Sequence, residues 1–293
     1  MAIPPLSVRN PFLSLLYRVM TFLAVLVIAR FVLELAGAPE SFTRVLSSTT
    51  GLFLASIYLA AVGPLRGGMK KFKELLVPAA FVSVWTVAWI ILATVVAALL
   101  RIERSHFAAK EDHGNWGQLG HHLLDHVVEI GVFFVVVLVV MSIVHALWRW
   151  PVTVGPGAVI GALVIMRYTL EAMGAPAPRA AAWSSTLAVF VSAFFLGAMA
   201  PRVGLNSARQ LLAPSLAIAF AWRSWIFLAT LLSAFVPFYK THFFDPSQGN
   251  VAFRLARFFA GGVLIEGMVT ALIVWGIAVW ISRATRTAAT SGA

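Results

Sequence analysis

The sequence contains no cysteine, and only 11% of its residues are charged. The lack of cysteine excludes disulfide bonds, thiolate metal sites, a cysteine nucleophile and thioether-linked haem. The shortage of charge is accompanied by 60% hydrophobic residues and a mean hydropathy of +0.91, which leaves too little polar surface for a soluble globular chain of 293 residues. The composition therefore predicts a protein embedded in a lipid bilayer.

Acidic residues are also scarce, because 11 Asp and Glu stand against 22 Lys and Arg, giving a net charge of +11. In a soluble chain this excess would indicate nucleic acid as a partner. Here the basic residues lie mostly in short segments between apolar runs, where they meet anionic lipid headgroups. We expect the bilayer as a partner and no nucleic acid. The sequence contains no Gly-rich phosphate loop, nucleophile elbow or HExxH signature, the motifs that would indicate an enzyme.

Apolar runs of about 17 to 26 residues recur along the chain, and a helix of this length crosses the roughly 30 Å of hydrocarbon in a bilayer. The alternation expected of an outer-membrane barrel is absent from the sequence. The fold class is therefore predicted to be all-α and polytopic, with eight transmembrane helices. They are expected at residues 11–35, 46–65, 74–101, 119–148, 152–173, 183–201, 209–237 and 251–282.

The chain repeats itself at an offset of about 137 positions. The segment RFVLELAGAP at residue 30 returns as RYTLEAMGAP at residue 167, and SST follows in both places. These matches include Arg, Glu, His, Pro and Trp as well as common apolar residues, which indicates a tandem duplication of a four-helix unit, residues 1–150 and 151–293. Further matches pair Pro78 with Pro214, Trp85 with Trp222, Thr94 with Thr230, His106-Phe107 with His242-Phe243, Gly114-Asn115 with Gly249-Asn250, and Glu129 with Glu266.

Four crossings return the chain to its starting side, so the two repeats should lie parallel, related by a pseudo-twofold axis along the membrane normal. The first helix shows no cleavage pattern and is expected to be retained. One face of the membrane collects most of the basic loop residues, including Arg66, Lys70, Lys71, Arg202 and Arg209. The positive-inside rule makes that face cytoplasmic, so both termini are expected in the cytoplasm and the protein in the inner (plasma) membrane.

Two Arg-Glu pairs occupy matching positions near the outer ends of the first and fifth helices. Arg30 and Glu34 stand at i and i+4, as do Arg167 and Glu171, so each pair shares a helix face. One interpretation is structural, in which the pairs pin helices together. The other is functional, in which they line a polar vestibule that opens outward. Each arginine is expected to have a second carboxylate within reach, from Glu129 and Glu266 respectively.

Arg223 lies near the middle of the predicted seventh helix, where the matching residue of the third helix is Thr86. A guanidinium at that depth cannot reach the interface easily, so it should face the bundle. We expect it to meet a carboxylate, an anionic ligand or several backbone carbonyls. Internal pairing and a functional role are both compatible with this position.

A stripe of polar side chains marks the start of the fourth helix. His122, Asp125, His126 and Glu129 stand at i, i+3, i+4 and i+7 and share a helix face. Two histidines at i and i+4 can ligate one metal, and carboxylates suit Zn, Fe or Mn, so a divalent-metal site is one hypothesis. The other is a solvated or proton-responsive face. Haem is disfavoured, because His126 and His145 lie at opposite ends of the same predicted helix.

Three functions follow from these patterns. The leading hypothesis is a carrier or channel-like permease for a small polar or ionic solute, with its site between the repeats, Arg223 as the buried charge and the Arg-Glu groups lining a vestibule. The second is a non-catalytic subunit or scaffold of an oligomer or larger membrane complex, in which the charge pairs hold helices together. The third is a membrane metal-binding protein or metalloenzyme that uses the stripe of His122, Asp125, His126 and Glu129.

Overall fold

The computed structural model describes residues 10–39, 43, 46–235, 241–245 and 249–291. Within these ranges every regular element is helical, which confirms the all-α prediction. Eight helices are long and apolar enough to cross a membrane, as expected, and they support a multi-pass membrane protein. They run over Pro11–Leu35, Ser48–Arg66, Phe72–Leu99, Trp116–Leu147, Pro151–Ala172, Pro178–Val203, Ala208–Phe235 and Val251–Thr287.

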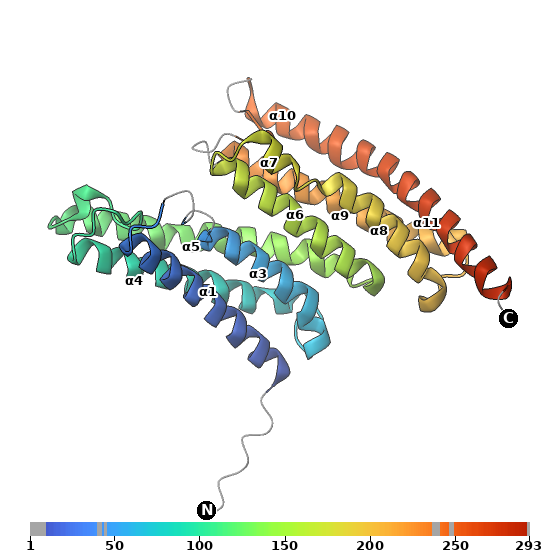
Figure 1. The fold of residues 1–293 in the computed structure, drawn as a ribbon, viewed down its shortest axis with the longest axis horizontal. Coiled ribbons are helices and arrows are strands. Elements are labelled where there is room, and N and C mark those ends of the chain that lie inside the picture. The colour runs from blue at the N-terminus through green and yellow to red at the C-terminus, as the bar shows by residue number, and fades with distance from the viewer. Residues whose placement is uncertain (1–9, 40–42, 44–45, 236–240, 246–248, 292–293) are drawn as a thin grey trace, which may run out of the picture. The chain divides into compact units, whose positions relative to one another are not determined.

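The chain divides into two compact units, residues 1–142 and 143–293, and each is described by itself. The first unit contains three packed helices, α1 (Pro11–Leu35), α3 (Ser48–Val62) and α4 (Leu76–Leu99), which lie side by side in Figure 1. Most of α5 (Trp116–Leu147) completes this unit. Short 3-10 turns extend the spans and occur in the loop between α4 and α5: η2 (Gly63–Arg66), η3 (Phe72–Leu75) and η4 (Lys110–Asp112).

The core of the first unit gathers apolar side chains from α1, α4, α5 and the loop that precedes α5. Val27, Ala97 and Leu119 pack in one buried cluster together with Phe107. Hydrogen bonds link the helices as well, since the indole Nε1 of Trp85 donates to the carbonyl of Met20 at 2.7 Å. At Gly51 of α3 a Cβ would collide with the Leu26 side chain of α1, so the small residue lets these two helices approach closely.

The second unit is built on four helices that contact one another: α6 (Val154–Ala172), α8 (Ser185–Met199), α9 (Ala208–Phe235) and α11 (Glu266–Ser291). In Figure 1, α11 follows α9 along its length. Two departures from the predicted helices occur here, a short helix α7 (Ala177–Ala181) and a last span that is not a continuous α-helix. That span begins as α10 (Val251–Phe258), passes through a π-helix, η7 (Phe259–Ile265), and continues as α11; the expected end of the seventh helix at Pro237 lies outside the described residues.

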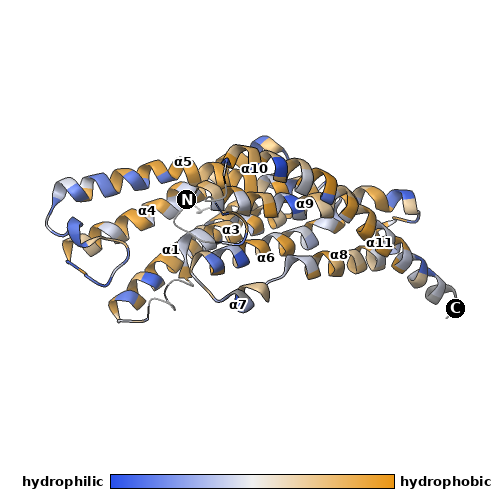
Figure 2. Ribbon diagram, turned by 90° about the horizontal axis from the view of Figure 1, so that it is seen from above, coloured by the Kyte–Doolittle hydropathy of each residue, from blue (hydrophilic) through white to orange (hydrophobic). Residues whose placement is uncertain are grey.

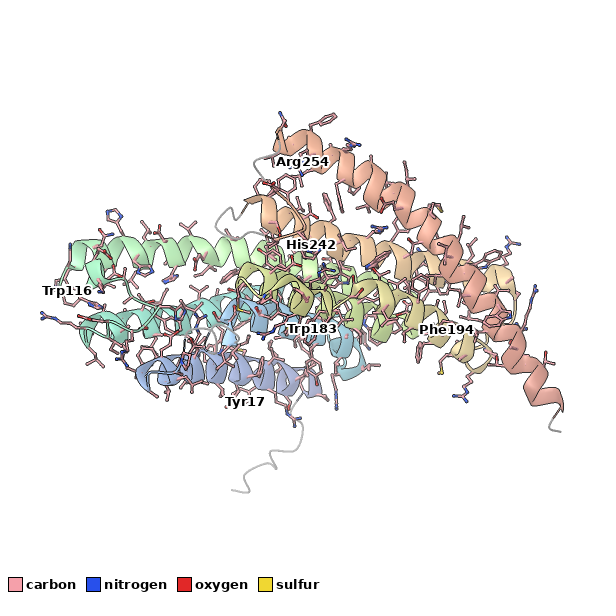
Figure 3. All side chains as sticks on the ribbon, turned by 45° about the horizontal axis from the view of Figure 1, so that its top comes forward. Tyr17, Trp116, Trp183, Phe194, His242 and Arg254 are labelled. Carbon is pink, nitrogen blue, oxygen red and sulfur yellow. The ribbon has the colours of Figure 1, made fainter. Side chains whose placement is uncertain are left out.

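Apolar side chains cover much of the outer surface of both units. Figure 2 shows hydrophobic residues along the spans and hydrophilic ones gathered toward helix ends and loops. Among the labelled side chains in Figure 3, Tyr17, Trp116 and Phe194 are 71%, 71% and 46% exposed. In water these surfaces would drive association, whereas in a bilayer they face lipid tails.

Gly157 and Gly161 of α6 form a GxxxG motif that packs against a tryptophan of α9. Trp225 of α9 is completely buried, and its Nε1 donates to the carbonyl of Gly157 at 3.2 Å. A Cβ at Gly161 would collide with the Trp225 indole, so only glycine lets the ring lie against the α6 backbone. At Gly261, by contrast, a Cβ would meet no described atom within 4 Å.

Replacing Gly161 by alanine should destabilise the second unit by about 1 to 3 kcal/mol, the usual cost of overpacking a filled site. Gly155 of the same helix is the matched control, because a Cβ there meets nothing within 4 Å. Thermal unfolding of the purified protein, followed by tryptophan fluorescence, should show a lower transition temperature for Gly161→Ala and not for Gly155→Ala. Equal transition temperatures would contradict the packing described here.

Candidate functional site

A buried carboxylate organises the C-terminal end of α1. Glu34 is 6% exposed, and its Oε1 accepts from the Nε of Arg30 at 3.1 Å and lies 2.6 Å from the Nδ1 of His106. Its Oε2 accepts from the backbone N–H of His106 at 3.2 Å and from the Ser105 hydroxyl at 3.4 Å. We call these four residues the Glu34 cluster. They tie the loop after α4 to the first helix.

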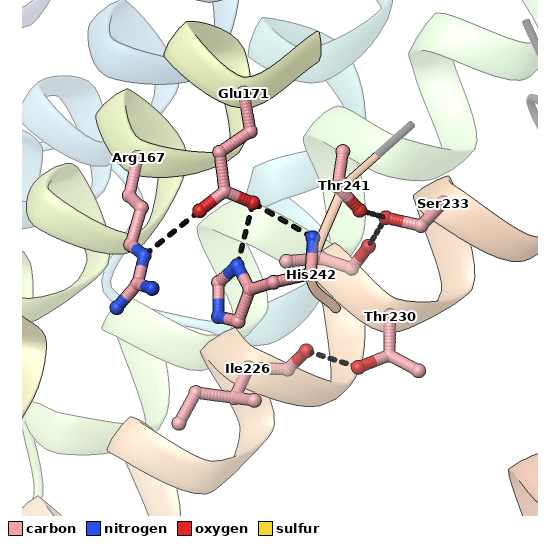
Figure 4. A network of polar contacts seen from close by, with 8 residues as sticks. Arg167, Glu171, Ile226, Thr230, Ser233, Thr241 and His242 are labelled. Atoms are coloured by element: carbon pink, nitrogen blue, oxygen red, sulfur yellow. Dashed lines mark hydrogen bonds and ion pairs between the residues drawn. The ribbon is translucent and has the colours of Figure 1, made fainter. Parts of the chain in front are cut away.

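The same arrangement occurs in the second unit, around Glu171 at the end of α6 (Figure 4). Glu171 Oε1 accepts from the Nε of Arg167 at 3.1 Å. Its Oε2 accepts from the backbone N–H of His242 at 2.9 Å and lies 2.5 Å from the Nδ1 of that residue. Beside this group, Thr241 and the buried Ser233 of α9 share a hydrogen bond of 2.6 Å. We call Arg167, Glu171 and His242 the Glu171 cluster.

Aromatic rings repeat the correspondence. The phenylalanine that follows each histidine packs on the residue that follows each arginine: Phe107 lies 6.0 Å from Phe31, and Phe243 lies 6.3 Å from Tyr168. The histidine ring lies 3.9 Å from its phenylalanine neighbour in the first unit and 4.0 Å in the second. Each cluster is therefore a polar contact covered by a small aromatic stack.

The two histidines contact the glutamates rather than the arginines, and the second carboxylates expected for Arg30 and Arg167 pair elsewhere. Glu129 forms its ion pair with His126, at 2.8 Å, and Glu266 pairs with Arg223. Neither glutamate joins an Arg30 or Arg167 group in the part of the chain that the structure describes. The sequence does contain a pattern that links the histidines to these clusters, because the His-Phe pair recurs at nearly the same offset as the Arg-Glu pair.

Arg223 of α9 meets a carboxylate, one of the three partner types expected for it. Its Nη2 lies 2.5 Å from Oε2 of Glu266, the first residue of α11. The guanidinium stacks on the ring of Trp222 at 4.3 Å, and its Nε is buried without a hydrogen-bond partner among the described atoms. Arg223 is 15% exposed and Glu266 is 58% exposed, so the pair reaches from the packed interior of the unit to a surface.

That surface belongs to a cavity of about 450 Å³ in the second unit, which we call the Arg254 cavity. Its wall combines cationic, aromatic and small residues from the loop before α10, from α10 itself and from the π-helix η7. Figure 3 marks Arg254 on α10 and His242 on the preceding loop. The described lining residues are Thr230, Phe243, Phe244, Arg254, Arg257, Phe258, Gly261, Gly262 and Glu266.

The histidine stripe of α5 is hydrogen-bonded within the first unit. His122 Nδ1 lies 2.8 Å from Oδ2 of the buried Asp112, and His126 contacts Glu129 and, through Nε2, the hydroxyl of Thr94 at 3.3 Å. Asp125 is exposed. Over the described ranges, no three His, Asp or Glu side chains gather closely enough to hold a metal ion. The metal hypothesis gains no support from this geometry, and metal analysis of the purified protein tests it.

Comparisons of the chain with models of protein families, with curated proteins and with solved structures found no match.

Proposed function

We propose that this protein is a carrier or channel-like permease that moves a small polar or ionic solute across the membrane. The observation that carries the proposal is the ion pair between Arg223 and Glu266, which lies within two apolar spans and borders the Arg254 cavity. Ionisable groups within spans are costly and usually mark solute or ion pathways. A pair that served packing alone would be expected to be enclosed on all sides, whereas Glu266 is more than half exposed.

The Glu34 and Glu171 clusters belong to the proposed function as supports of an outer vestibule. Each holds a loop histidine against a spanning helix, with the imidazole 37% exposed in the first unit and 47% exposed in the second. A carboxylate that fixes Nδ1 orients the Nε2 edge of the ring, as it does for ligand and acid-base histidines. These are the groups that a solute would meet first in such a vestibule.

Tandem duplication is part of the same proposal, since two like-oriented halves can rock against each other. Local backbone geometry supports it. Six glycines in the described ranges adopt a positive φ, which a residue with a Cβ adopts only with strain. All six form pairs near the repeat offset, so matching turns occur in both halves: Gly37 with Gly174, Gly67 with Gly204, and Gly114 with Gly249. The proposed orientation places both termini in the cytoplasm and the protein in the plasma membrane.

A scaffold function is the second candidate, and the hydrogen bonding of Glu34 favours it. Four donor contacts occupy this carboxylate, as expected of a group that pins a loop to a helix. The two candidates differ in what they require of Glu266: a scaffold needs it to be sealed by lipid or a partner, whereas a permease needs it to meet water.

Cysteine labelling separates these cases directly, because the native chain has no cysteine that would react. In proteoliposomes, Glu266→Cys should react rapidly with a membrane-impermeant methanethiosulfonate reagent. Val269→Cys is the control, since Val269 is an exposed apolar residue of the same helix and should face lipid. A Glu266→Cys variant that reacts no faster than Val269→Cys would favour the scaffold.

Solute flux tests the function itself. Proteoliposomes should be exposed to gradients of glycerol, urea, potassium chloride, potassium phosphate and potassium lactate, with valinomycin present to balance charge, and swelling followed by light scattering. We expect one or more of these solutes to enter faster than in protein-free vesicles, and this flux to be lost in Arg223→Ala but retained in Arg209→Gln, a change at an exposed arginine of the same helix. No flux for any solute, or undiminished flux in Arg223→Ala, would contradict the proposal.

A further inference from the structure

The first part of the last span is two residues longer than the matching part of α5, and it contains a π-helix. Asn115 and Asn250 begin the two helices in the same way, since each side chain accepts from the backbone N–H three residues further on, at 3.1 and 3.0 Å. From these asparagines the matching glutamates, Glu129 and Glu266, are 14 and 16 residues away. A π-helix accommodates inserted residues within a helix and occurs often at functional sites. The π-helix Phe259–Ile265 lies between Asn250 and Glu266, where the two additional residues must be accommodated.

The positions after the asparagine carry different chemistry in the two halves. Four residues on, the first half has Leu119, which is buried in the core, and the second half has Arg254, which lines the cavity. Seven residues on, the first half has His122, which is bound to Asp112 at 2.8 Å. The second half has Arg257, which is exposed and makes no hydrogen bond or ion pair with any described residue. The second half thus has two guanidinium groups where the first half has none.

The contacts of these groups leave the cavity cationic. Arg254 stacks on the ring of Phe244 at 4.3 Å and donates to the backbone carbonyl of Asp245. Glu266, the one acidic residue among the described lining residues, is paired with Arg223 outside the wall. Arginines one turn apart on a helix present their guanidinium groups to the same space. Such groups bind phosphate oxygens with several parallel hydrogen bonds.

We propose that the Arg254 cavity binds a phosphate group, held by Arg254 and Arg257, with any apolar body of the ligand packed on the phenylalanine rings. This proposal rests on the proposed function, because it names the class of ligand that binds next to the Arg223–Glu266 pair of the proposed permease. The phosphate can come from two sources, a soluble phosphorylated or inorganic anion or the headgroup of an anionic lipid. Basic pockets of membrane proteins take both.

The test is ligand-dependent thermal stability of the full-length protein in a zwitterionic detergent, read from tryptophan fluorescence. One arm titrates potassium phosphate against potassium chloride at equal ionic strength. The other titrates short-chain phosphatidylglycerol against short-chain phosphatidylcholine. Wild type is compared with the double variant Arg254→Gln/Arg257→Gln and with Arg209→Gln/Arg283→Gln, which removes the same charge from exposed positions of the second unit.

Wild type and the Arg209/Arg283 variant should be stabilised by phosphate or by phosphatidylglycerol in a saturable manner. The Arg254/Arg257 variant should need about tenfold more ligand or more for the same shift. A shift with potassium phosphate identifies a soluble anion, and a shift with phosphatidylglycerol alone identifies the lipid headgroup. No shift in either arm, or an equal shift in the Arg254/Arg257 variant, overturns the inference. Binding without solute flux would refute transport and leave the site standing, whereas flux without binding would refute the site alone.

Discussion

Replacing Glu34 by alanine should lower the free energy of unfolding by about 3 kcal/mol, because it removes the carboxylate from a buried ion pair and its hydrogen bonds. The carboxylate serves Arg30, His106 and Ser105 at once, and Arg30 is only 12% exposed. Glu171→Ala should act in the same way in the second unit. Equilibrium unfolding in mixed micelles of a mild detergent and sodium dodecyl sulfate measures the change.

The matched control is Glu103→Ala, which removes an exposed carboxylate from the loop that also carries His106. Its free energy of unfolding should stay within about 0.5 kcal/mol of wild type, as for most surface substitutions. A Glu34→Ala variant as stable as Glu103→Ala would show that the Glu34 cluster does not hold the loop.

Exchanging the charges of Arg223 and Glu266 should separate the stability that comes from their mutual attraction from the stability that each charge contributes alone. Arg223→Glu places two carboxylates together and Glu266→Arg places two guanidinium groups together, so each single variant should unfold more readily, by about 2 kcal/mol or more. The double variant Arg223→Glu/Glu266→Arg should recover much of that loss, with a coupling energy of about 1 kcal/mol or more between the sites. The half-exposed position of Glu266 limits the size of both effects.

Flux distinguishes the stability role of this pair from its transport role. If the pair only packs helices, the exchanged variant should regain solute flux together with stability. If Arg223 presents a positive charge to the solute, the exchanged variant should regain stability without flux. Strictly additive effects of the two single substitutions would contradict the ion pair itself.

Most of the fold could be predicted from the sequence because lipid imposes a simple rule on helix length. Each predicted span coincides with an apolar helix, and the first has the predicted bounds, Pro11–Leu35. The π-helix of the last span was missed, since its residues, Phe259–Ile265, are as apolar as an ordinary helix. Only the change in spacing between matching residues of the two halves marked it.

The candidate site was predictable where contacts are local and not where they depend on tertiary structure. Arg30 and Glu34 pair as expected from their i, i+4 spacing. The partner of Arg223 comes from a helix more than 40 positions away, and neither periodicity nor charge pattern identifies it. Glu129, the second carboxylate expected for Arg30, contacts His126 of its own helix, whereas Glu34 binds the loop residue His106 as well as Arg30.

Side-specific labelling of single cysteines tests the proposal that the chain consists of two four-helix repeats with the same orientation in the membrane. Arg66→Cys and Arg202→Cys fall in matching turns, as do Ala109→Cys and Asp245→Cys in the two longer loops. In right-side-out cells, an impermeant thiol reagent should reach Ala109→Cys and Asp245→Cys and should reach Arg66→Cys and Arg202→Cys only after permeabilisation. Labelling of Arg66→Cys and Arg202→Cys from opposite sides of the membrane would contradict the parallel repeat.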